Sequence, residues 1–290
     1  MSTGKSPFQR AVSGFFRHHS GMLGLGVVVI FVLLAAAACL ISPVDPYSQN
    51  TDLRFLPPLW QEGHHWPYIL GTDVLGRDVF SRLLFGARLS MMIGFISVSV
   101  GASVGIPLGM ASGFFGGVVD IVIMRLIDVM LAFPSILLAV CIVAILGPSL
   151  ENAMISIGVV SIPQYARVVR ASVLAEKERE YVTADIALGR KRMNILFSAI
   201  LPNIFSPLLV IATLSFAGAV LEAAGLSFIG LGAQPPTPEW GALLLEGKKY
   251  VFTAPWLIFF PGLAILFTVV GFNLFGDALR DVFDPKSMQR

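Results

Sequence analysis

"SMMIGFISVSVGASVGIPLGMASG", residues 90–113, contains no charged side chain. A helix that crosses about 30 Å of hydrocarbon needs about 20 such residues, so this stretch is long enough to span a membrane. Of the 290 residues, 56% are hydrophobic and only 13% are charged. A soluble domain of this size carries more polar surface. The sequence therefore predicts an all-α membrane protein rather than a soluble protein with an unusually apolar core.

Further apolar stretches lie on both sides of this run. Pro163 and terminal arginines make the fourth stretch the weakest. The first is longer than the apolar core of about 7–15 residues in a signal peptide, so we expect an uncleaved helix, not a cleavage site at Cys39. The six predicted spans are 21–41, 88–113, 121–147, 152–170, 204–231 and 256–277.

Lysine and arginine predict the orientation of these spans. Most of the 20 basic residues would face the cytoplasm if the N-terminus is inside, as the positive-inside rule requires. We therefore expect both termini in the cytoplasm. Residues 1–87 would hold a cytoplasmic tail, one helix and a periplasmic loop, and 88–290 a core of five helices with a cytoplasmic loop at 171–203. The basic residues are spread rather than striped, so no nucleic acid is expected.

The loop contains the charged stretch "EREYVTADIALGRKRMNILFSAILPN", residues 178–203. Val182 and Ile186 have helical spacing, and Gly189 is expected to end the helix. The basic residues 190–192 suit lipid headgroups, and Pro202 suits the start of the next helix. The helix could simply lie on the membrane as a connector, or it could enter a groove on a cytoplasmic partner. Composition leaves both interpretations open.

The same stretch resembles the "EAA" loop of binding-protein-dependent ABC transporter permeases. In that loop, Glu-Ala-Ala is followed after three residues by glycine, and about nine residues later by an Ile-x-Leu-Pro ending. The matching positions are Thr183, Ala184, Asp185, Gly189 and "AILP" at 199–202, with departures at Thr183, Asp185 and Ala199. A literal Glu-Ala-Ala at 222–224 has no glycine at the required offset and no Leu-Pro behind it, and it lies within a predicted span.

Three other stretches resemble the dipeptide/oligopeptide/nickel permeases, and specifically the subunit with an additional N-terminal membrane helix. They are "LGTDVLGRDVFSRLLFGARLS" (70–90), "GLGAQPPTPEWGALL" (230–244) and "FPGLAILFTVVGFNLFGDALRDVFDP" (260–285). The resemblance covers roughly residues 20–286. Composition and spacing alone indicate only a polytopic membrane protein with a cytoplasmic helix.

The resemblance implies a type I ABC importer permease fold in the bacterial inner membrane. It implies half of a translocation path for di- or oligopeptides, with nickel and glutathione still open as cargo. The implied partners are a second homologous permease, two ATP-binding subunits, an external solute-binding protein and membrane lipid. ATP and Mg would bind the ATPase subunits, so this chain would hold no cofactor and no catalytic residue. Thr183, Ala184, Asp185 and Gly189 would contact an ATPase or act as a hinge.

An ion-coupled transporter or channel that works without an ATPase is the alternative. Such carriers usually show several intramembrane carboxylates or broken helices at mid-depth. Glu222 is one deep carboxylate, and we expect it either to line the translocation path or to serve helix packing. Asn273 is a weaker candidate for the path.

Two other motifs point away from enzymatic and metal chemistry. "TGKS" at 3–6 lacks the preceding strand and first glycine of a phosphate-binding loop. His18–His19 and His64–His65 are adjacent pairs, which make poor joint metal ligands on a helix. No metal site is expected.

Side-chain spacing predicts several local contacts. Arg125 should pair with Asp128, and Asp78 with Arg82 on a solvated periplasmic helix. Trp240 is expected to anchor at the membrane interface or on a docked partner. The repeated four-residue spacing of Gly101, Gly105 and Gly109 predicts close approach of a neighbouring helix.

Overall fold

The structure is a computed structural model that describes Phe15 and residues 18–283. Within these residues every regular element is helical, and the β contacts are limited to an isolated bridge between Thr72 and Asp78. The longer helices are α2 (His19–Ile41), α3 (Val79–Phe115), α4 (Gly117–Leu131), α5 (Ser135–Leu146), α6 (Leu150–Lys177), α10 (Phe205–Phe228) and α12 (Trp256–Phe283). The short elements are η1 (Thr51–Leu53), α7 (Glu180–Ala187), α8 (Arg192–Ile195), η2 (Leu196–Ile200), α9 (Leu201–Asn203), α11 (Trp240–Gly247) and η3 (Lys248–Tyr250).

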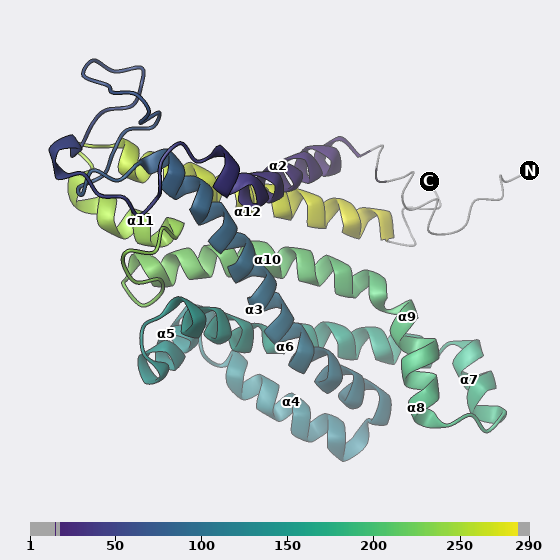
Figure 1. Cartoon of the computed structure of the whole chain (residues 1–290). Helices are drawn as coiled ribbons and strands as arrows, with labels where there is room; N and C mark the ends of the chain where they lie inside the picture. Colours follow the sequence, from purple (N-terminus) through teal and green to yellow (C-terminus); the bar gives the residue numbers. More distant parts are fainter. Residues whose placement is uncertain (1–14, 16–17, 284–290) are drawn as a thin grey trace, which may run out of the picture.

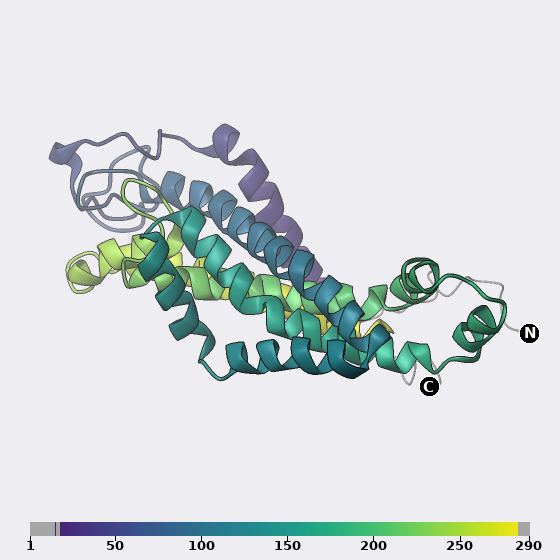
Figure 2. The same cartoon turned by 90° about the horizontal axis from the view of Figure 1, so that it is seen from below.

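The long helices lie side by side as a bundle, and the short elements gather at its two ends (Figure 1). The loop 42–78 and α11 lie at one end, while α7 and α8 extend beyond the other (Figures 1 and 2). α2 begins and α12 ends near each other, with His18 Nε2 3.4 Å from a carboxylate oxygen of Asp281. Both of these helix ends lie at the α7 end of the bundle (Figure 1).

Four helices, α2, α3, α10 and α12, are each long and apolar enough to cross a membrane. α4 and α5 together could form a fifth crossing, but the chain bends by 89° between them. The predicted span at 121–147 is therefore not one continuous helix but two helices with a sharp bend between them. Pro134 explains the bend, because proline has no N–H to donate and disfavours helical backbone in the residue before it.

α6 occupies the predicted fourth span and continues beyond it at both ends. Its 28 residues form one helix that includes Pro163 and is about 42 Å long at 1.5 Å per residue. It is not among the helices apolar enough to be counted as crossings by themselves. Arg170 of α6 donates two hydrogen bonds of 2.6 Å to Asp120, which attaches α4 to α6.

Glycines on α3 let its backbone approach α6 closely. A Cβ placed on Gly105 would lie 2.5 Å from the Cβ of Tyr165, and one on Gly109 would lie 2.5 Å from the carbonyl oxygen of Ala166. A Cβ on Gly101 would meet the Ser161 hydroxyl. The predicted close packing is confirmed, since no larger side chain fits this seam without displacing α6.

Candidate functional site

α7 extends beyond the end of the bundle (Figure 2), and its one buried side chain is Val182. Val182 is fully buried and packs in a cluster with Val173 of α6 and with Ile195 and Ile200 further along the chain. Thr183 and Ala184 are exposed, as are Tyr181 and the apolar Ile186 and Leu188. α7 therefore turns one residue inward and presents most of its surface outward.

The end of α7 is fixed by a glycine cap. Gly189 has φ +73° and its N–H donates to Ile186 O, while the Arg190 N–H donates to Asp185 O at 3.1 Å. This pair of bonds is the Schellman arrangement, which favours glycine because its backbone is left-handed. The Arg190 guanidinium also pairs with Asp185 at 2.7 Å and donates to Ser198 Oγ at 2.7 Å. The prediction that Gly189 ends the helix is confirmed.

Hydrogen bonds through Tyr181 join the two ends of the segment that holds α7. The Tyr181 hydroxyl donates to Glu176 at 2.8 Å and accepts from the Asn203 side-chain amide at 3.1 Å. Partial burial, followed by the bond to Glu176, raises the pKa of the Tyr181 phenol. α7 is thus braced by α6 on one side and by α9 on the other, and the four predicted coupling residues lie together on α7 and its cap.

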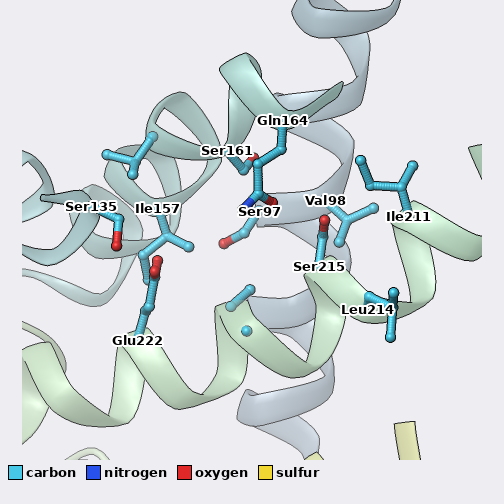
Figure 3. A pocket seen from close by; sticks show the side chains of 13 residues that line it. Ser97, Val98, Ser135, Ile157, Ser161, Gln164, Ile211, Leu214, Ser215 and Glu222 are labelled. Atoms are coloured by element: carbon cyan, nitrogen blue, oxygen red, sulfur yellow. The ribbon is translucent and has the colours of Figure 1, made fainter. Parts of the chain in front are cut away.

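A cavity of about 350 Å³ lies between α3, α6 and α10, next to the start of α5 (Figure 3). Glu222 of α10 and Ser135 of α5 point toward one another at one end of it (Figure 3). Asn273 of α12 does not line this cavity. The polar lining residues are Ser97, Ser135, Ser161, Gln164, Ser215 and Glu222.

Sequence reasoning found Glu222 but missed the other polar groups of the cavity. Gln164 follows Pro163 within an apolar run and could have been recognised by the cost of placing an amide in a membrane. The serines gave no usable signal, because serine is common on helices that pack closely in membranes.

A second, more open hollow of about 700 Å³ adjoins the first along α6 and α10. Gln164, Ile211 and Leu214 line both hollows, while Arg167 and Arg280 line only the second. The Arg167 guanidinium lies 2.7 Å from Asp128 of α4.

The predicted pair of Arg125 with Asp128 is therefore wrong. Arg167 comes to Asp128 from α6, so the pair joins two helices instead of two successive turns of one helix. Spacing within α4 could not reveal this contact.

A buried ion network lies at the opposite end of the bundle from α7. Arg77 donates to Asp73 and to Glu246, each at 2.6 Å, and Arg82 lies 3.3 Å from Glu246 and 3.7 Å from Asp73. The side chains of Arg77 and Arg82 are 1% and 0% exposed. The prediction of a solvated helix at this position is wrong, because Glu246 of α11 and the loop before α3 cover both arginines.

Asp78 does not pair with Arg82, contrary to prediction. It caps the start of α3 and accepts from the Ser81 N–H at 2.8 Å. α3 begins at Val79, so Asp78 occupies the N-cap position, where its carboxylate accepts from the free N–H groups of the first helical turn. Burial raises the pKa of the Asp78 carboxyl.

Trp240 is buried inside the chain. It is 1% exposed, its indole N–H donates to Leu83 O at 3.1 Å, and its ring packs against Gly86. The prediction of an anchor in the membrane interface or on a docked partner is therefore wrong. The ring instead attaches α11 to α3.

In the part of the chain that the structure describes, no group of three or more His, Cys, Asp or Glu side chains could hold a metal ion. His64 and His65 are exposed on the loop before α3. The "TGKS" stretch at 3–6 lies outside the described residues.

Comparison with known proteins identifies the class of this helical bundle. Residues 105–289 match the family described as binding-protein-dependent transport system inner membrane component, and residues 6–58 match the N-terminal TM domain of oligopeptide transport permease C. A methionine ABC transporter solved in inward-facing conformations shares the fold, with a TM-score of 0.57 at 21% identity over 69% of this chain and 96% of that chain.

Relatives of higher identity span nearly the whole chain. A dipeptide transport system permease protein of Haemophilus influenzae is 46% identical over 98% of this chain and 97% of its own length. A di/tripeptide transport system permease protein of Pseudomonas aeruginosa is 49% identical over 93% of this chain and 90% of its own length. A glutathione transport system permease protein of Pectobacterium atrosepticum is 40% identical over 97% and 92%. The chain therefore belongs to the binding-protein-dependent transport system inner membrane components.

Proposed function

We propose that the chain is one permease subunit of an ATP-driven importer and forms half of the path by which di- and oligopeptides cross the inner membrane. The names of the relatives from Haemophilus influenzae and Pseudomonas aeruginosa support the peptide substrate. Peptides are favoured over glutathione because these two relatives are more similar in sequence than the glutathione permease.

The observation that carries the proposal is the braced and exposed α7. A short helix held at both ends can transmit the motion of a partner to the bundle, whereas a freely mobile loop cannot. In the proposal, a separate ATPase subunit grips the exposed side of α7 at Thr183, Ala184 and Asp185, and the Gly189 cap sets the direction in which the chain leaves. ATP and Mg bind to two such ATPase subunits, and a second homologous permease and a solute-binding protein complete the assembly.

The proposed topology has six membrane crossings, with α4 and α5 together as the third and α6 as the fourth. Both termini and α7 are then cytoplasmic, and the loop 42–78 and α11 are periplasmic. This orientation is supported by Figure 1, in which one end of the bundle holds α7, the start of α2 and the end of α12. Residues 1–87 then precede the permease core of 88–290.

Glu222 and the cavity that it lines belong to the proposed translocation path. The cavity lies within the bundle and has polar groups among its mainly apolar lining, and the second hollow extends it toward the α7 end. Asn273 stays a prediction for the path, on the basis of its polar side chain in α12.

The test is uptake of a labelled dipeptide by proteoliposomes that hold both permeases, both ATPase subunits and the binding protein. Uptake is expected only when ATP is present on the side of the membrane where the ATPase subunits are bound. Uptake by this chain alone, or uptake that follows an ion gradient without ATP, would instead support an ion-coupled carrier or channel.

Gly189→Asp tests the coupling role of α7. The expected result is continued ATP hydrolysis with uptake reduced by about tenfold or more, because a side chain at φ +73° strains the cap and redirects the chain. Gly63→Asp is the control, since Gly63 also has a positive φ, +85°, and an added Cβ would come no closer than 3.8 Å to Pro57, but it lies in the loop 42–78. Equal loss of uptake in both variants would contradict a specific role for α7.

A further inference from the structure

Glu222 stands out among the charged groups of the two adjoining hollows. In the described part of the chain it is the single carboxylate that lines either one, and the other charged lining residues are Arg167 and Arg280. Arg167 is paired with Asp128, whereas no carboxylate of the described residues lies within ion-pair distance of Arg280. The two hollows together form one groove. This groove carries an acidic residue at the Glu222 end and basic residues at the end near α7.

Glu222 faces the start of α5 and has no basic side chain beside it in the cavity. Ser135, which faces it, is the first residue of α5, and a helix N-terminus carries a partial positive charge from its free N–H groups. No basic side chain lines the cavity that Glu222 occupies. Among the residues that line this cavity, Glu222 therefore has no ion-pair partner, and its carboxylate is available to bind a cation.

The neighbouring hydroxyl groups of the cavity are arranged as hydrogen-bond acceptors. Ser97 donates its proton to Met154 O at 3.0 Å, and Ser161 donates to Gly158 O at 2.7 Å. Each hydroxyl oxygen keeps lone pairs that can accept from a ligand. Ser215 adds a further hydroxyl group to the lining of the cavity. One carboxylate with several neutral acceptors suits a donor-rich monovalent cation.

An ammonium group fits this set better than a metal ion does. It carries three N–H donors and a single charge, whereas Ca²⁺ takes about 6–8 oxygen ligands and usually more than one carboxylate. A dipeptide supplies such an ammonium at one end. Its extended length is about 7 Å, and the groove from Glu222 to Ser206 covers 16 residues of α10, or about 24 Å. A dipeptide therefore cannot reach both charged ends at once.

We propose that Glu222 is a specificity-determining residue that binds the N-terminal ammonium of a peptide within this cavity. The proposal rests on the import function proposed above and adds to it the residue that recognises one end of the cargo. After release from Glu222, the peptide moves toward Arg280, whose charge attracts its carboxylate.

The test measures dipeptide uptake by the complete transporter in proteoliposomes, in a parent in which the exposed Cys39 and Cys141 are replaced by serine. Glu222→Gln and Glu222→Cys should lower uptake by about tenfold or more, since both remove the charge-assisted hydrogen bond to the ammonium group. Glu222→Asp should retain most of the uptake. Assembly with the ATPases and the affinity of the binding protein for the dipeptide should stay unchanged in all three variants.

Charge rescue separates recognition from packing. Treating Glu222→Cys with a sulfonatoethyl methanethiosulfonate restores a negative charge and should restore uptake, whereas the trimethylammonium-ethyl reagent should not. The cysteine-free parent should respond to neither reagent. Normal uptake by Glu222→Gln would overturn the proposal, as would equal loss in Glu222→Asp and Glu222→Gln without rescue by the anionic reagent. If the parent itself imports no peptide, the proposed function fails and not merely the role of Glu222.

Discussion

Glu246→Gln should strongly destabilise the end of the bundle that carries the loop 42–78. Glu246 accepts from Arg77 at 2.6 Å and lies 3.3 Å from Arg82, so one carboxylate serves two arginines that are almost fully buried. Asp73 and Glu246 together balance Arg77 and Arg82. The glutamine keeps the shape of the side chain but leaves one buried positive charge without compensation.

The magnitude follows from the burial of the network. Removing one partner of a buried ion pair costs about 3–5 kcal/mol. In large domains 1 kcal/mol moves the Tm by about 2–4 °C, so the expected decrease is about 6 °C or more. The assay is thermal unfolding of the detergent-solubilised protein, followed by tryptophan fluorescence because Trp240 and Trp256 lie in helices next to the network.

Asp128→Asn is the matched control for this experiment. Asp128 and Arg167 form a pair of similar distance, 2.7 Å, but their side chains are 50% and 54% exposed. Exposed pairs contribute about 0–1 kcal/mol, so this variant should change the Tm by only a few degrees. If the two variants lower the Tm equally, burial does not determine the strength of the Glu246 network and the reasoning is refuted.

Two further predictions concern packing and pH. Gly105→Leu should prevent assembly of the bundle or lower its Tm by several degrees, because even a Cβ at this position would lie 2.5 Å from the Cβ of Tyr165. The packing control is Gly218→Leu, where a Cβ meets no atom within 4 Å. Thermal unfolding of both variants is the measurement. Burial raises the pKa of Glu239 above its ordinary value of 4.5, so the folded state keeps a proton that the unfolded chain releases. Stability from this group is therefore greatest below pH 4.5 and falls as pH rises through the raised pKa. Glu239→Gln should remove that part of the pH dependence of the Tm, and an unchanged pH profile would contradict it.

The sequence predicted the features that depend on neighbouring residues along the chain. Long apolar runs located α2, α3, α10 and α12, since a helix of sufficient length and hydropathy needs no distant partner to be recognised. The cap at Gly189 depends only on the backbone of one turn, so it could be read from a glycine after a helical pattern.

The errors concern contacts between distant parts of the chain. Arg77 and Arg82 were predicted to be solvated because Glu246, more than 160 positions away, could not be paired with them from spacing. The bend at Pro134 was missed because apolar residues continue on both sides of it, and hydropathy does not report direction. Trp240 was assigned to a surface since its acceptor, Leu83 O, belongs to another helix.

The glycine seam between α3 and α6 has a mechanical consequence. Where two backbones touch directly, no flexible side chains lie between them to absorb sliding, so the two helices must shift together as one rigid body. A conformational cycle that opens and closes the groove then has to find its hinge elsewhere. The break at Pro134, where neither α4 nor α5 constrains the other by helical hydrogen bonds, is the part of the bundle best suited to yield.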